Sequence, residues 1–253
     1  AYALALTAGG EHFDRVRPFL ILSALGCGGL FLLVEARASA PLIRLAAFRD
    51  VELSAGLMMT ALVSTVMMAT LVVGPFYLSR GLRLEEMMVG AVMSVGPGVS
   101  ILCGVPAGRI VDRLGASTTV TVGLAVMAAG VLALIVLPPM AGMAGYIAAI
   151  AFLAPGYQLF QAANNTSVMA GVPQDRRGVI SGLLSLSRNL GFITGASVMG
   201  AVFAFASGNA AQSVPSPEAA ATGMQISFIV AEALVALAIT LSIGSRLLSK
   251  RNW

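Results

Sequence analysis

The chain of 253 residues is 58% hydrophobic and only 10% charged, whereas an ordinary soluble domain carries roughly a quarter charged residues. This composition excludes a soluble fold for most of the chain and predicts an all-α protein embedded in a lipid bilayer. The net charge of +4 comes from basic residues scattered over short connections. They form no basic stripe, so we expect no nucleic-acid partner.

The sequence offers no donor set for a metal or a cofactor. Its one histidine is His12, and its two cysteines, Cys27 and Cys103, both lie inside apolar runs. No metal-ligand spacing is present, and the cysteines are expected to pack as inert side chains. We therefore expect neither a metal nor a cofactor.

Residues 1–52 form the first part of the chain. The segment 1–8 is apolar but too short to span a bilayer of ~30 Å, and no basic segment precedes it. We interpret it as the end of a helix, and the chain as a piece of a longer membrane protein. The run at about 18–35 is long enough to span. A connector over residues 36–52, apolar on one side, is expected to lie on the cytoplasmic membrane surface.

Six further apolar runs make up residues 53–253, and each is long enough to cross a bilayer. The predicted spans are 53–78, 87–108, 118–137, 141–169, 178–206 and 223–245. With the C-terminus placed in the cytoplasm, ten of the fifteen basic residues fall in inside connections and four outside. The positive-inside rule favours this orientation.

A short connection over residues 104–117 carries three of the few charges, Arg109, Asp112 and Arg113. Asp112 is expected either to cap the next helix or to accept a hydrogen bond from an arginine across the loop. Cytoplasmic loops are often rich in these residue types, so an ordinary loop is the plain alternative.

Glycines give this connection its pattern. Gly104 and Gly108, four residues apart, are predicted to let a neighbouring helix approach closely. Gly108, Asp112, Arg113 and Gly115 form a Gly-x-x-x-Asp-Arg-x-Gly pattern. This pattern resembles the signature loop of the major facilitator superfamily, which follows the second helix of each six-helix half.

Further stretches resemble the fourteen-helix drug:H+ antiporter branch of that superfamily (QacA/EmrB type). They are the connector motifs within residues 31–49 and the motifs at 177–183 and 188–191. The resemblance implies the C-terminal six-helix half of a major facilitator fold, preceded by one linker helix. The N-terminal half of the same transporter, with its principal proton-coupling acids, would then lie outside this sequence.

The resemblance also implies a function. We expect proton-coupled efflux of small apolar or cationic compounds across a bacterial inner membrane, by alternating access of two halves. Another small-molecule class, such as a metabolite or a siderophore, is the nearest alternative, and a truncated fragment without transport activity is a third. An enzyme would need clustered His, Asp or Glu at one membrane depth, and the sequence has none.

The fifth of the six runs carries a polar series that is a candidate for lining the substrate cavity. It consists of Tyr157, Gln158, Gln161, Asn164 and Asn165. The spacing of three and four between Gln158, Gln161 and Asn165 places them on one helix face. Such a face either lines a cavity or makes hydrogen bonds between helices.

Three residues on other runs are further candidates. Arg188 lies inside the sixth run, where it either contacts the cavity or bonds helix ends as a structural arginine. Glu232 is a candidate proton relay in the last run, with a neutral, hydrogen-bonded carboxyl as the alternative. Met58, in a methionine-rich run, either adapts to varied substrates or simply packs.

Overall fold

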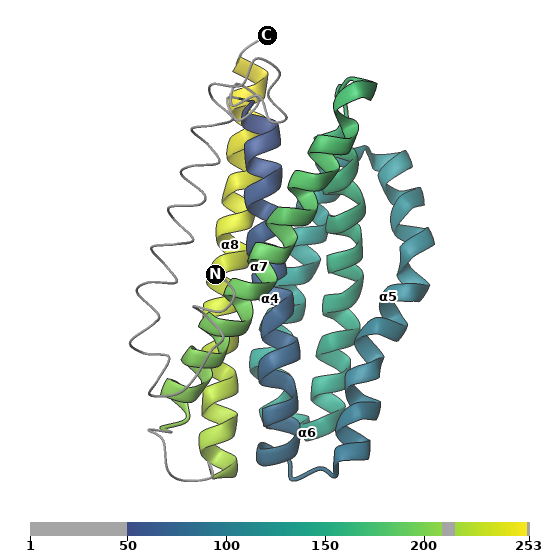
Figure 1. Cartoon of the computed structure of the whole chain (residues 1–253). Coiled ribbons are helices and arrows are strands. Elements are labelled where there is room, and N and C mark those ends of the chain that lie inside the picture. Colours follow the sequence, from purple (N-terminus) through teal and green to yellow (C-terminus); the bar gives the residue numbers. More distant parts are fainter. Residues whose placement is uncertain (1–49, 209–215, 252–253) are drawn as a thin grey trace.

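The computed structural model describes residues 50–208 and 216–251, and every regular element among them is a helix (Figure 1). The predicted linker helix and most of the connector lie outside these residues. The elements are α4 (Val51–Phe76), η2 (Tyr77–Gly81, a π-helix), α5 (Glu86–Leu114), α6 (Ala116–Met169), η3 (Gln174–Arg176, a 3-10 turn), α7 (Arg177–Ala206) and α8 (Pro217–Arg251). Five of the helices are long and apolar enough to cross a membrane.

Helix α6 makes two passes, because its 54 residues would reach roughly 80 Å at 1.5 Å per residue. The backbone turns at Gly142, with φ 55° and ψ −129°, a conformation that glycine adopts with little cost. The two arms then pack on each other: a Cβ at Gly130 would lie 2.6 Å from Leu153 Cα. The helix therefore passes through Pro138 and Pro139, where the sequence predicted an end, and turns three residues later.

The helices alternate in direction along the chain, so the bundle has two distinct ends (Figure 1). The end where α4, α6 and α7 begin is also where α5 and α8 finish. We call this the α7-start end. Helices α4, α7 and α8 group together, and α5 stands at the side of the bundle against α6. One face of α5 therefore lacks a neighbour within the described residues.

Small residues bring α7 against α4. A Cβ at Gly195 would lie 2.7 Å from the Thr65 carbonyl oxygen, and one at Gly191 would collide with the Ala61 carbonyl. Thr65 Oγ1 donates to the Gly191 carbonyl at 3.1 Å across the same interface. Close backbone approach through glycine is typical of membrane helix pairs, which gain little from hydrophobic burial.

Other glycines of the bundle do not make a close contact with a neighbouring helix. Apart from the adjacent residues and the backbone of its own helix, no described atom lies within 4 Å of a Cβ built at Gly104, Gly108 or Gly182. The close helix contact predicted at Gly104 and Gly108 is therefore not found within the described part of the chain. The spacing of glycines along one helix therefore does not predict a close contact, because it does not identify the helix that faces them.

The glycine interface generates a stability prediction. Gly191→Leu is expected to destabilise the bundle by about 1–3 kcal/mol, because the new side chain must displace the α4 backbone. Gly182→Leu, on the same helix but in open space, is the matched control and should change stability little. The midpoint of thermal unfolding in detergent, followed by circular dichroism, measures both. Equal losses would contradict the close α4–α7 packing.

Candidate functional site

A cavity of about 230 Å³ lies between α4, α5, the second arm of α6, and α7. Its wall is almost wholly apolar, with aromatic and thioether side chains from all four elements. The residues that define it here are Met67, Met93, Tyr146, Tyr157 and Phe192. Apolar concave sites with a few polar groups are typical of small-molecule binding.

Small and rigid residues keep this space open. Gly96 and Pro97 of α5 line the cavity without a long side chain, and a Cβ at Gly96 would lie 3.3 Å from Ile150 Cγ2. Tyr146 is only 1% exposed, and its hydroxyl lies 3.8 Å from Met93 Sδ. The aromatic wall is therefore fixed by packing rather than free to collapse into the cavity.

Polar side chains from α6 and α7 meet beside the cavity. The Gln161 amide is oriented so that its Oε1 accepts from Arg188 Nη2 at 2.7 Å and from Nε at 2.9 Å. The Tyr157 hydroxyl, on the cavity wall, lies 3.4 Å from the Gln161 amide. Phe192, also on the wall, is one helical turn from Arg188. This cluster of Tyr157, Gln161 and Arg188 borders the cavity on the side of the α7-start end.

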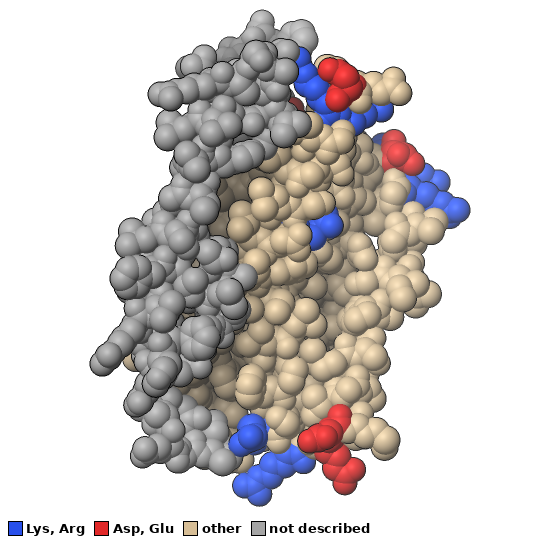
Figure 2. Space-filling view, in the orientation of Figure 1, with Lys and Arg blue, Asp and Glu red and all other residues tan. Residues whose placement is uncertain are grey.

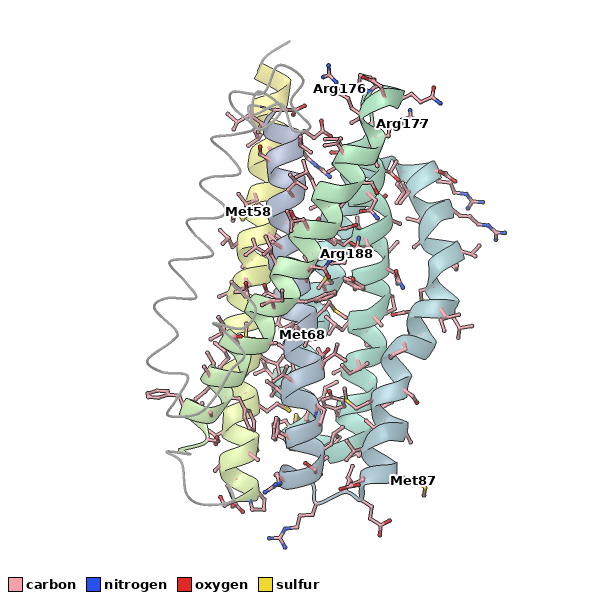
Figure 3. The ribbon with its side chains drawn as sticks, viewed as in Figure 1. Met58, Met68, Met87, Arg176, Arg177 and Arg188 are labelled. Carbon is pink, nitrogen blue, oxygen red and sulfur yellow. The ribbon has the colours of Figure 1, made fainter. Side chains whose placement is uncertain are left out.

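Arg188 carries a charge within an apolar face. Figure 2 shows Lys, Arg, Asp and Glu gathered at the two ends of the bundle, with one blue patch in the tan middle. Figure 3 labels Arg188 at that height, far from Arg176 and Arg177. Among the described residues the guanidinium makes no ion pair, and its partner Gln161 is neutral. Because an intramembrane charge without a counter-charge is costly, Arg188 is a candidate functional residue.

The remaining members of the polar series have different partners. Gln158 Nε2 donates to the carbonyl of Ser100, a cavity residue on α5, at 3.2 Å. Asn164 is 1% exposed and donates to Gly56 O and Thr60 Oγ1 on α4, at 3.1 and 2.8 Å. Asn165 Oδ1 is buried without a hydrogen-bond partner in the described residues. The polar series thus reaches three neighbouring helices: α5 through Gln158, α4 through Asn164 and α7 through Gln161.

Met58 and Glu232 do not line the cavity. Met58 is 54% exposed on α4, and Met67 is the methionine of that helix that reaches the wall. Glu232 belongs to α8, which contributes nothing to the cavity, and its Oε2 is buried without a partner in the described residues. Along α8 it lies between Gln225, which bonds Ile135 O of the first arm of α6, and Ser242, which bonds Thr121 of that arm.

Sequence reasoning missed Met93, Tyr146 and Phe192 as wall residues. Each lies in an apolar run, where its character matches that of ordinary packing residues, so no sequence signal separates it from them. Polar residues are conspicuous in such runs, and this is why Tyr157, Gln161 and Arg188 were identified and their apolar neighbours were not.

The signature segment is helical rather than a loop. Helix α5 continues through Arg109, Asp112 and Arg113 to Leu114, and Gly115 alone, with φ 81°, separates it from α6. Gly115 is the N-cap of α6 without a side-chain bond, so Asp112 does not cap that helix. Asp112 also makes no ion pair within the described residues, and the charged side chains are exposed at the α7-start end.

The two neighbouring asparagines allow a structural role to be separated from a functional one. Asn164→Leu is expected to destabilise the protein by about 1 kcal/mol or more, because Asn164 bonds α4 twice. Asn165→Leu should change stability by less than about 0.5 kcal/mol, since no bond is lost. Thermal unfolding of both variants in detergent measures the difference. A larger loss for Asn165→Leu would contradict these assignments.

Comparison with known proteins agrees with the geometry. The family model described as Major Facilitator Superfamily matches residues 16–196. The chain is 27% identical over 190 residues to the riboflavin transporter RibZ of Clostridioides difficile, which covers 75% of this chain and 42% of RibZ. It is 26% identical over 209 residues to the quinolone resistance protein NorB of Staphylococcus aureus, with 81% and 45% covered. It therefore spans less than half the length of these relatives.

A solved structure shows the same fold. A bacterial homologue of the iron transporter ferroportin, in an outward-facing state with soaked iron, superposes with a TM-score of 0.62 at 20% identity. The match covers 84% of this chain and 50% of that one. At this identity the likeness concerns the fold alone. Because the family model matches most of the sequence and the helices adopt this fold, the chain belongs to the major facilitator superfamily.

Proposed function

We propose that this chain is the C-terminal six-helix half of a fourteen-helix drug:H+ antiporter of the QacA/EmrB type, with one preceding linker helix. The parent protein would export small organic compounds in exchange for protons, by alternating access between two halves. The observation that carries this proposal is the apolar cavity with the cluster of Tyr157, Gln161 and Arg188 at its border. The similarity to the quinolone resistance protein NorB supports it.

The arrangement of the helices supports a role as one half of a transporter. Four passes build the cavity, and α8 and the first arm of α6 contribute little to it. On α5, Ile101, Leu102 and Val105 are each at least 66% exposed. A second half placed against the cavity face would enclose the substrate from the other side, and rocking of the two halves would open it to each face of the membrane in turn.

The charges at the bundle ends support an orientation. Two described arginines, Arg80 and Arg83, lie at the opposite end. The α7-start end carries at least five, namely Arg109, Arg113, Arg176, Arg177 and Arg246. By the positive-inside rule we place the α7-start end and the C-terminus in the cytoplasm, and the protein in a bacterial inner membrane.

A transporter of another small-molecule class is the second candidate. RibZ, named a riboflavin transporter, matches 75% of this chain at 27% identity, which is as strong a similarity as that to NorB. Both candidates use the same fold and differ in the chemistry of the cavity. The proton-relay role of Glu232 is a weaker part of the proposal, because α8 does not line the cavity.

Transport measured in everted inner-membrane vesicles tests the function. With the full-length protein, energised vesicles should accumulate a fluorescent quinolone several-fold above control vesicles, and an uncoupler should abolish the accumulation. Riboflavin serves as the second probe. This chain alone should show no accumulation, because half of a two-sided cavity cannot alternate. Uptake that ignores the uncoupler would contradict proton coupling, and uptake by the chain alone would contradict the half-transporter assignment.

Asp112 provides a test of the signature segment. Its carboxylate lies in the last turn of α5, at the negative end of the helix dipole, where an anion is unfavourable. A partner outside the described residues would offset this cost in one global state of the transporter. Asp112→Asn in the full-length protein should therefore slow turnover about fivefold, since an exposed pair contributes about 1 kcal/mol, and leave substrate binding nearly intact.

The matched control is Asp175→Asn, another exposed carboxylate at the same end, which lies 3.9 Å from Arg176. It should leave both quantities unchanged. Equilibrium binding and efflux rate are measured on one preparation. Loss of binding with normal turnover of the bound substrate would show that the segment does not control the conformational change.

A further inference from the structure

The charge of Arg188 has no counter-charge within the described residues. Of the described groups, its guanidinium bonds only the neutral Oε1 of Gln161. Seven of the eight described acids lie at helix ends or in connections, namely Asp50, Glu52, Glu85, Glu86, Asp112, Asp175 and Glu218. The eighth, Glu232, is on α8, which does not reach the cavity. The cavity border is therefore positively charged.

The Gln161 amide fixes the guanidinium in one orientation. Oε1 accepts one N–H of Nη2 and the N–H of Nε, so the other N–H of Nη2 and both N–H groups of Nη1 are without a bond in the described residues. Arginine presents several donors in a rigid planar fork that suits carboxylate oxygens. The Tyr157 hydroxyl, on the wall and 3.4 Å from the same amide, supplies a further polar group beside this fork.

The rest of the wall favours flat apolar groups. Tyr146 and Phe192 present aromatic rings, and Met67 and Met93 present thioethers, which make favourable contacts with aromatic ligands. A cation in this cavity would be repelled by Arg188, and nothing in the wall offers a carboxylate to hold it. An aromatic anion would satisfy both the apolar wall and the unpaired charge.

We propose that the substrate is an aromatic compound bearing a carboxylate, with its ring in the cavity and its carboxylate paired with Arg188. This inference rests on the proposed function and narrows it, because it favours anionic compounds over the cationic ones that the sequence resemblance implied. The Gln161 amide acts as a positioning group that fixes the guanidinium beside Tyr157 at the cavity border.

Three probes that share one ring system test the charge preference. They are 2-naphthoate, the neutral 2-naphthamide and the cationic 2-naphthyltrimethylammonium ion. Binding is measured by calorimetry on the full-length transporter in nanodiscs at neutral pH. We expect naphthoate to bind at least about tenfold more tightly than naphthamide, as for charge-assisted hydrogen bonds, and the cation to bind most weakly.

Variants then assign the preference to Arg188. Arg188→Gln should reduce the ratio of naphthoate to naphthamide affinity to about one while changing naphthamide affinity less than about threefold. Arg188→Lys should keep part of the ratio, since the charge remains without the planar fork. Arg176→Gln, at the end of the bundle, should keep the full ratio and serves as the matched control. Circular dichroism verifies the fold of each variant.

The outcomes separate the two proposals. Equal binding of all three probes, or a carboxylate preference that survives Arg188→Gln, would overturn the anionic substrate and leave the transporter assignment standing. A preference for the cation would show that a carboxylate elsewhere in the full-length protein neutralises Arg188, and would also overturn it. If the wild-type protein bound none of the probes and transported neither quinolone nor riboflavin, the proposed function itself would fail.

Discussion

The hydrocarbon interior of a membrane offers no water, so each polar group there needs a partner within the protein. Among the described residues most Ser and Thr hydroxyls bond a carbonyl three or four residues earlier in their own helix, and a smaller set of side chains bonds the backbone of another helix. Thr65 bonds the Gly191 carbonyl, Tyr77 bonds the Pro138 carbonyl, and Asn164 bonds the Gly56 carbonyl. These bonds depend on close helix approach, which explains why glycine lies in the α4–α7 interface and between the two arms of α6.

Polar groups that lack such a partner are therefore candidates for a functional role. Asn164 is satisfied twice and is structural, whereas Asn165 Oδ1 and Glu232 Oε2 have no partner in the described residues. Arg188 has hydrogen bonds but no counter-charge in the part of the chain that the structure describes. Arg188 lies at the border of the cavity, whereas Glu232 is on α8, which contributes no residue to the cavity wall. The proposed function therefore rests on the arginine.

Hydropathy predicted an all-helical membrane protein because the apolar runs are long and their connections short. It could not place the turn of α6 at Gly142, since the Pro138–Pro139 pair is the stronger breaker in the sequence and yet lies within the helix. The spacing of Gln158, Gln161 and Asn165 predicted a shared face. Only the structure shows that Gln158 reaches α5 and Gln161 reaches α7, because spacing along one helix does not identify its neighbours.

The walls of the cavity differ in how firmly they are held. Helix α7 is fixed to α4 by backbone contact at Gly191 and Gly195, and to the second arm of α6 by Arg188 and Gln161. Helix α5 contacts chiefly α6, and Gln158 and Tyr146 make polar contacts with it there. Elements with few buried contacts open at the lowest free energy, so α5 is the wall best suited to move. A ligand that touches both Arg188 on the α6–α7 side and Met93 on α5 would link the rigid wall to the mobile one.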